Sequence, residues 1–80
     1  MKNIIDIRSI NSYNNGHING AIHINQYDLL FNPEKYIKKN ETYYIYCNSG
    51  VSSKVIVDRL NSKGYHTVNI EGGYNNYLLR

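Results

Sequence analysis

The residues best suited to chemistry are a single cysteine and the short polar segment that follows it. Cys47 stands between the apolar run Tyr43–Tyr46 and the segment Asn48–Ser53, which holds one glycine and three serines. This order predicts a buried strand that ends at the cysteine, then a tight loop, then a helix. In a parallel α/β sheet Cys47 would lie at the carboxyl end of a strand, where such folds place their sites.

The segment after Cys47 is suited to holding a thiolate. Unpaired N–H groups in the loop and at the start of the following helix carry partial positive charge, which favours the thiolate over the thiol. Gly50 would permit a positive φ, so that these amides can point inward. We therefore predict that Cys47 is a nucleophile in a small anion-binding cradle.

Each of these residues also has a plainer interpretation. Cys47 could be a buried, inert cysteine, since free cysteine is among the most buried residue types. Ser49, Ser52 and Ser53 could serve only as helix caps, or one of their hydroxyls could bind the sulfur or a bound anion. Lys54 lies in the first turn of the predicted helix, where a cation opposes the helix dipole. It is therefore either tolerated at the surface or useful for attracting anions.

Composition and charge limit the classes of function. Eighty residues make one domain, residues 1–80. The net charge of +3 suits small anionic substrates but is too mild to indicate nucleic-acid binding. A single cysteine excludes an internal disulfide and a Cys-x-x-Cys redox pair. Any group that binds covalently to Cys47 must consequently leave to an acceptor outside the chain.

The sequence carries no sign of a membrane or metal partner. It has no apolar run long enough to span a bilayer and no signal-peptide core behind its start. The three histidines, at positions 17, 23 and 66, lack the spacing of a metal site. We therefore predict a cytoplasmic protein without metal, and the richness in Asn, Ile, Lys and Tyr suggests a bacterial source.

The chain alternates predicted strands and helices. Strands are expected at 3–8, within 17–24, at 42–46 and at 66–70, and helices at 9–15, 26–31, 34–38, from the serines to about 63, and at 74–79. This alternation predicts an α/β fold with a small, mainly parallel four-stranded sheet flanked by helices on both faces. Asp6 and Arg8, at the end of the first strand, are expected to bond each other or the backbone.

Four segments, in this order, resemble the rhodanese-like domain family. They are an Asp-x-Arg strand at Ile5–Arg8, a Gly-His-Ile-x-Gly-Ala turn at Gly16–Ala21, an active-site strand and loop at Tyr44–Ser53, and a closing Gly, strand and Gly-Gly at Gly64–Gly73. The resemblance implies a minimal version of the rhodanese-like fold, because the chain begins almost at the Asp-x-Arg strand. A sheet edge left exposed in this way could be covered by a partner chain.

The resemblance implies a sulfurtransferase. In such enzymes the cysteine takes the outer sulfur of thiosulfate or another donor as a persulfide and passes it to cyanide or a thiol, without a cofactor. Cys47 would be the sulfur carrier, cradled by the loop residues Asn48, Ser49, Gly50, Val51, Ser52 and Ser53. The implied partners are a small anionic sulfur donor and a thiol acceptor, either of low molecular weight or a thioredoxin-like protein.

The loop departs from the family pattern at Ser52. Many members carry an arginine there, which helps to hold the anionic donor. The alternatives are therefore a non-catalytic binding module or a carrier that relays persulfide sulfur between proteins. A cysteine-dependent phosphatase or arsenate reductase would place an arginine six residues after the cysteine. Ser53 occupies that position, and the loop holds no arginine.

Overall fold

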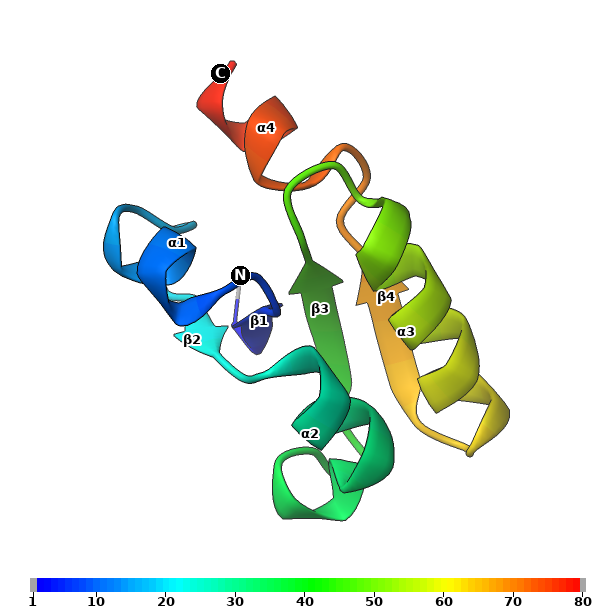
Figure 1. Cartoon of the computed structure of the whole chain (residues 1–80). Helices are drawn as coiled ribbons and strands as arrows, with labels where there is room; N and C mark the ends of the chain where they lie inside the picture. Colours follow the sequence, from blue (N-terminus) through cyan, green and yellow to red (C-terminus); the bar gives the residue numbers. More distant parts are fainter. Residues whose placement is uncertain (1, 80) are drawn as a thin grey trace.

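The computed structural model describes residues 2–79 as an α/β domain (Figure 1). Its strands are β1 (Ile4–Asp6), β2 (Ile22–His23), β3 (Thr42–Tyr46) and β4 (His66–Asn69). Its helices are α1 (Ile10–Asn14), α2 (Gln26–Phe31), the 3-10 turn η1 (Pro33–Lys35), α3 (Val51–Ser62) and α4 (Gly73–Leu78). All neighbouring strands pair in parallel. The predicted four-stranded parallel sheet is confirmed.

The strand order β2-β1-β3-β4 creates a natural position for a site. The chain runs from β1 to β2 on one side and then crosses back to β3 on the other side of β1. Parallel sheets bind ligands beyond the carboxyl ends of strands at such a reversal. The loop from β3 to α3 leaves the sheet at this end, and Figure 1 shows α4 beyond the arrowhead of β3.

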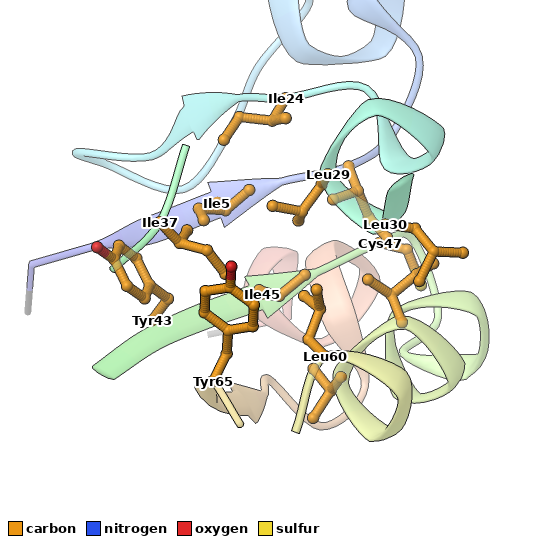
Figure 2. Close-up of a cluster of buried hydrophobic side chains, with 13 residues drawn as sticks. Ile5, Ile24, Leu29, Leu30, Ile37, Tyr43, Ile45, Cys47, Leu60 and Tyr65 are labelled. Atoms are coloured by element: carbon orange, nitrogen blue, oxygen red, sulfur yellow. The ribbon is translucent and has the colours of Figure 1, made fainter. Parts of the chain in front are cut away.

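Helices cover both faces of the sheet because successive strand residues point to opposite sides. Ile5 and Ile45 pack on one face with residues of α2 and α3, as Figure 2 shows. Ile4 and Tyr46 point to the other face, where Tyr13 of α1 and Tyr74 of α4 pack against them. The predicted helices on both faces are therefore confirmed.

Two predicted elements have bounds that differ from those in the structure by more than one residue. The first strand is β1, Ile4–Asp6, and not residues 3–8, since the Asp6 carboxylate accepts the backbone N–H of Arg8 at 2.8 Å and turns the chain. The helix expected at 34–38 is the 3-10 turn Pro33–Lys35. The chain leaves that turn at Tyr36, where φ is −123°, and this lets Ile37 reach the core at 3% exposure.

The longest helix, α3, has 12 residues, well short of the ~20 that cross a bilayer. Within residues 2–79 no helix combines the length and the apolar character that a membrane span requires.

Candidate active site

Cys47 directly follows β3, at the carboxyl end of the strand, as its sequence context predicts. It points to the same face as Ile45 and belongs to the cluster that includes residues of α3 (Figure 2). Its side chain is 8% exposed, so the sulfur lies at the boundary between the core and the loop above it. A nucleophile there is shielded from bulk water but remains next to the surface.

Three groups from the loop and α3 converge on the Cys47 sulfur. The backbone N–H of Gly50 donates to Sγ at 3.1 Å, and the backbone N–H of Ser53 donates at 3.4 Å. The Ser53 hydroxyl lies 3.3 Å from the same atom. Gly50 is the N-cap of α3 with φ of 91°, a left-handed conformation that favours glycine. The predicted cradle of inward-pointing amides is therefore present.

The hydrogen bonds on Cys47 favour its charged form. Burial alone would raise the pKa of the Cys47 thiol, because a buried charge loses its hydration. The Ser53 hydroxyl and the amides of Ser53, Gly50 and Ser49 outweigh this, so that the pKa lies below its ordinary value. All of these groups are uncharged. The thiolate is stabilised by oriented dipoles and not by a counter-ion.

The start of α4 holds the other side of the cysteine loop. The N–H of Tyr74 donates to the carbonyl of Cys47 at 2.9 Å, and the N–H of Asn75 donates to that of Asn48 at 2.9 Å. A Cβ added to Gly73 would lie 2.3 Å from the Cys47 carbonyl oxygen, so only glycine fits. This contact explains the second glycine of the Gly-Gly pair in the closing segment of the family pattern.

Asn69, which sequence reasoning treated only as part of a strand, connects β4 to the site. Its Oδ1 accepts the Ser53 hydroxyl at 2.5 Å, and its Nδ2 donates to the Gly50 carbonyl at 3.1 Å. The signal in the sequence was an amide side chain near the end of the expected strand 66–70. Because β4 lies beside β3, such a residue reaches the same end of the sheet as Cys47.

The other predicted loop residues lie at the surface around the sulfur. Exposed side chains there are Asn48, Ser49, Val51 and Ser52. The serine that contacts the sulfur is Ser53, whereas Ser52 faces a groove between α2 and α3. Gly50 is the N-cap of α3 and has no side chain to cap it, but the Ser49 hydroxyl accepts the backbone N–H of Val51, the first residue of the helix, at 3.4 Å.

Lys54, for which the sequence left open surface tolerance or attraction of anions, forms an ion pair on the outer surface of α3. Its Nζ lies 2.7 Å from Asp58 Oδ1, and the two side chains are 58% and 60% exposed. Its charge is therefore partly balanced by Asp58.

A second buried polar group lies at the end of β1. Arg8 bonds both carboxylate oxygens of Asp6, the shortest contact being 2.7 Å from Nη2 to Oδ2. The Tyr46 hydroxyl donates to Asp6 Oδ2 at 2.6 Å, and Arg8 also donates to the Gly16 carbonyl at 2.6 Å. This confirms the expected bond between Asp6 and Arg8.

Comparison with known proteins agrees with this geometry. A family model described as the rhodanese-like domain matches residues 1–80. The chain belongs to the rhodanese-like domain family. The resemblance identified from four sequence segments is thereby confirmed.

Relatives of this chain are named as sulfurtransferases. YtwF of Bacillus subtilis, provisionally named a sulfurtransferase, is 36% identical over 88% of this chain and 67% of its own length. The thiosulfate sulfurtransferase GlpE of Shewanella oneidensis is 33% identical over 89% of this chain and 70% of its own length. A crystal structure of SSP1007 from Staphylococcus saprophyticus matches with a TM-score of 0.86 and 37% identity, covering 94% of this chain and 74% of that one.

Proposed function

We propose that this chain is a rhodanese-type sulfurtransferase that carries sulfane sulfur as a persulfide on Cys47. The observation that carries the proposal is the convergence of two backbone amides and the Ser53 hydroxyl on the Cys47 sulfur. The names of its relatives support the same class of reaction. The proposal treats residues 1–80 as one domain. Its bacterial source and cytoplasmic location stay predictions.

The chemistry needs only the thiolate and a sulfur donor. With thiosulfate, the Cys47 thiolate would attack the outer sulfur, and the S–S bond of the donor would break. Sulfite would leave with the bonding electron pair, and Cys47 would hold a persulfide with its negative charge on the outer sulfur. Cyanide or an acceptor thiolate would then attack the outer sulfur, and the S–S bond of the persulfide would break. The outer sulfur would leave as thiocyanate or as a new persulfide, and Cys47 would again be a thiolate. The hydrogen bonds that lower the pKa of Cys47 favour the thiolate that this step needs.

The loop would stabilise the charge at each stage. In the resting protein its amides favour negative charge on the Cys47 sulfur. We assign binding of the outer sulfur and of the donor's oxygens to the loop residues that surround it: Asn48, Ser49, Gly50, Val51, Ser52 and Ser53. Backbone N–H groups in such a cradle bind anions without a charged side chain.

The direct test is to follow sulfur on the protein. Wild-type protein is incubated with thiosulfate, its intact mass is recorded without reductant, and cyanide is then added to assay thiocyanate. We expect a gain of one sulfur atom that cyanide discharges, and no gain in the matched variant Cys47→Ala. Equal behaviour of the two proteins would disprove the role of Cys47. No gain with thiosulfate, polysulfide or a small-molecule persulfide would leave a binding module as the function.

A second candidate is a carrier that relays sulfur between proteins. It is favoured by the lack of any cation in residues 47–53 and by the pairing of Lys54 with Asp58. A thiosulfate dianion would therefore be held by amide dipoles alone, whereas a protein donor brings binding energy of its own. Val51, which follows Gly50 in the chain and begins α3, is 71% exposed and could contact such a partner.

The same mass measurement separates the two candidates. Loading by a persulfide or polysulfide but not by thiosulfate, followed by rapid transfer to a thioredoxin-like protein, would indicate the carrier. Loading by thiosulfate and release as thiocyanate would indicate the thiosulfate-dependent enzyme.

A further inference from the structure

The Ser53 hydroxyl has one proton and two neighbours that can accept it. Cys47 Sγ lies 3.3 Å from the oxygen, and Asn69 Oδ1 lies 2.5 Å from it. Ser53 is fully buried, at 0% exposed, so water cannot replace either partner. A hydroxyl donates one hydrogen bond and accepts others through its lone pairs. At any moment, therefore, only one of the two neighbours receives the proton.

The backbone of Gly50 decides which end of the Asn69 side chain faces Ser53. Asn69 Nδ2 donates to the Gly50 carbonyl at 3.1 Å. If the amide were turned around, its oxygen would face this carbonyl and two acceptors would oppose each other. Asn69 Oδ1 is thus held toward Ser53, and the shorter of the two distances assigns the proton to Asn69. The Ser53 oxygen then offers a lone pair to a neutral Cys47 thiol.

We infer that Asn69 is a positioning residue that competes with the Cys47 sulfur for the Ser53 proton and so favours the uncharged form of that sulfur. This inference rests on the proposed role of Cys47 as the sulfur carrier. When Cys47 loses its proton, Ser53 must turn its hydroxyl away from Asn69 to donate to the thiolate. Thiolate formation therefore carries the cost of one hydrogen bond to Asn69.

The competition has a second effect once sulfur is bound. In a Cys47 persulfide the negative charge lies on the outer sulfur, and the inner sulfur needs the Ser53 proton less. Ser53 can then return its proton to Asn69. The Asn69 contact is therefore lost in the thiolate and kept in the thiol and the persulfide. Asn69 thereby favours the sulfur-loaded protein over the free thiolate.

The test measures the pKa of Cys47 from the pH dependence of its alkylation by iodoacetamide. Four proteins are compared: wild type, Asn69→Leu, Ser53→Ala and the double variant. We expect Asn69→Leu to lower the Cys47 pKa by about half to one unit, because one neutral hydrogen bond becomes available to the thiolate. In the Ser53→Ala background the same change should not lower the pKa, because no proton is left to compete for.

The double variant excludes a purely structural role for Asn69. If Asn69 only tethers the Gly50 carbonyl, its loss loosens the loop and raises the Cys47 pKa equally in both backgrounds. That result, or no shift in either background, overturns the inference. Asn69→Asp gives a second measurement, should the leucine variant unfold. Its carboxylate binds the Ser53 proton more strongly, so its rise in pKa should be larger with Ser53 than with Ala at position 53.

The alkylation readout is independent of the proposed function. Iodoacetamide reports the thiolate whether or not the protein transfers sulfur. A protein that never gains sulfur but shows the coupled pKa shifts would refute the sulfurtransferase and leave the Ser53–Asn69 competition intact. A protein that gains sulfur while Asn69 and Ser53 act independently would refute the inference alone.

Discussion

Two neighbouring strands end in buried polar groups that behave in opposite ways. Asp6 ends β1 and Tyr46 ends β3, and these two residues lie opposite each other in the sheet. Asp6 forms an ion pair with Arg8, whereas the residue after Tyr46 is Cys47, which has a free thiol. The two groups thus share one end of the sheet but differ in how their charge is balanced.

The group at the end of β1 is electrostatically complete. Burial alone would lower the pKa of Arg8, but the hydrogen bonds and the charge of Asp6 raise it, so Arg8 stays charged. The guanidinium also lies 4.0 Å from the centre of the Tyr74 ring. Among the described residues, every buried side-chain nitrogen and oxygen has a partner. Such a group fixes the fold at this end of the sheet.

The group at the end of β3 has no counter-ion within the loop. Neutral donors point at the Cys47 sulfur, and no cation neutralises it within the loop. They stabilise a negative charge without satisfying it by an ion pair, as the proposed attack of the sulfur on a donor requires. At this edge of the sheet, therefore, a paired charge gives stability, whereas the oriented dipoles favour the thiolate that the proposed reaction needs.

The largest expected effect comes from removing the charge of Asp6. Asp6→Asn leaves Arg8 buried without its counter-charge and turns one acceptor into a donor that faces Arg8 or Tyr46. We expect a loss of about 3–5 kcal/mol in the free energy of unfolding. Chemical denaturation followed by circular dichroism measures it. In the fraction that remains folded, the Cys47 alkylation rate should not change.

Tyr46→Phe is the matched control for this prediction. It keeps the ion pair and removes only the hydroxyl that donates to Asp6 and accepts the Ile18 N–H. The expected loss is about 1–3 kcal/mol. If Asp6→Asn cost no more than Tyr46→Phe, the ion pair would not be the main support of this edge.

An intermediate loss of stability is expected at the start of α4, where Tyr74 contacts both Arg8 and the Cys47 carbonyl. Gly73→Ala places a Cβ 2.3 Å from the Cys47 carbonyl and imposes a side chain at φ of 58°. We expect a loss of about 2–3 kcal/mol in unfolding free energy and slower sulfur loading of Cys47. Thermal or chemical denaturation and the mass assay measure the two effects.

Gly20→Ala controls for backbone strain alone. Gly20 also has a positive φ, 88°, but an added Cβ there meets no atom within 4 Å. It should lose about 1 kcal/mol and load sulfur at the wild-type rate. Equal losses for the two variants would show that the contact with Cys47 is not what requires glycine at position 73.

Much of this architecture could be predicted from local patterns. The apolar run before Cys47 and the glycine after it predicted a strand and a loop, because each depends on residues close in the chain. Alternation of strands and helices predicted the parallel sheet, which β3 and its neighbours form. The position of Cys47 at a strand end followed from these two features alone.

The contacts that tune the cysteine could not be predicted in this way. Ser53 of α3 and Asn69 of β4 are 16 residues apart in the chain. They meet only because β4 lies beside β3 and α3 packs against both strands. Which of three serines would reach the sulfur depended on the start of α3, and Gly50 sets that start. The pair Lys54–Asp58 is different, since its spacing of four residues on a helix was visible in the sequence.

The smallest expected effect concerns Lys54, the cation that directly follows the loop in the sequence. Lys54→Gln removes an exposed ion pair with Asp58, so the free energy of unfolding should change by less than ~0.5 kcal/mol. If Lys54 attracts the anionic donor, the variant should raise KM for thiosulfate at low salt without changing kcat. Added salt should abolish the difference, because it screens exposed charges.

Lys35→Gln is the matched control for this prediction. It removes one positive charge from η1, which precedes the amino end of β3, whereas Cys47 follows the carboxyl end of that strand. An equal rise in KM for both variants would mean that net charge attracts the donor and that Lys54 has no special place. A rise for Lys54→Gln alone would mean that one exposed cation supplements the amide dipoles around Cys47. No rise for either would leave those dipoles as the sole attraction for the anion, which is the sharpest form of the contrast with the paired charges at Asp6.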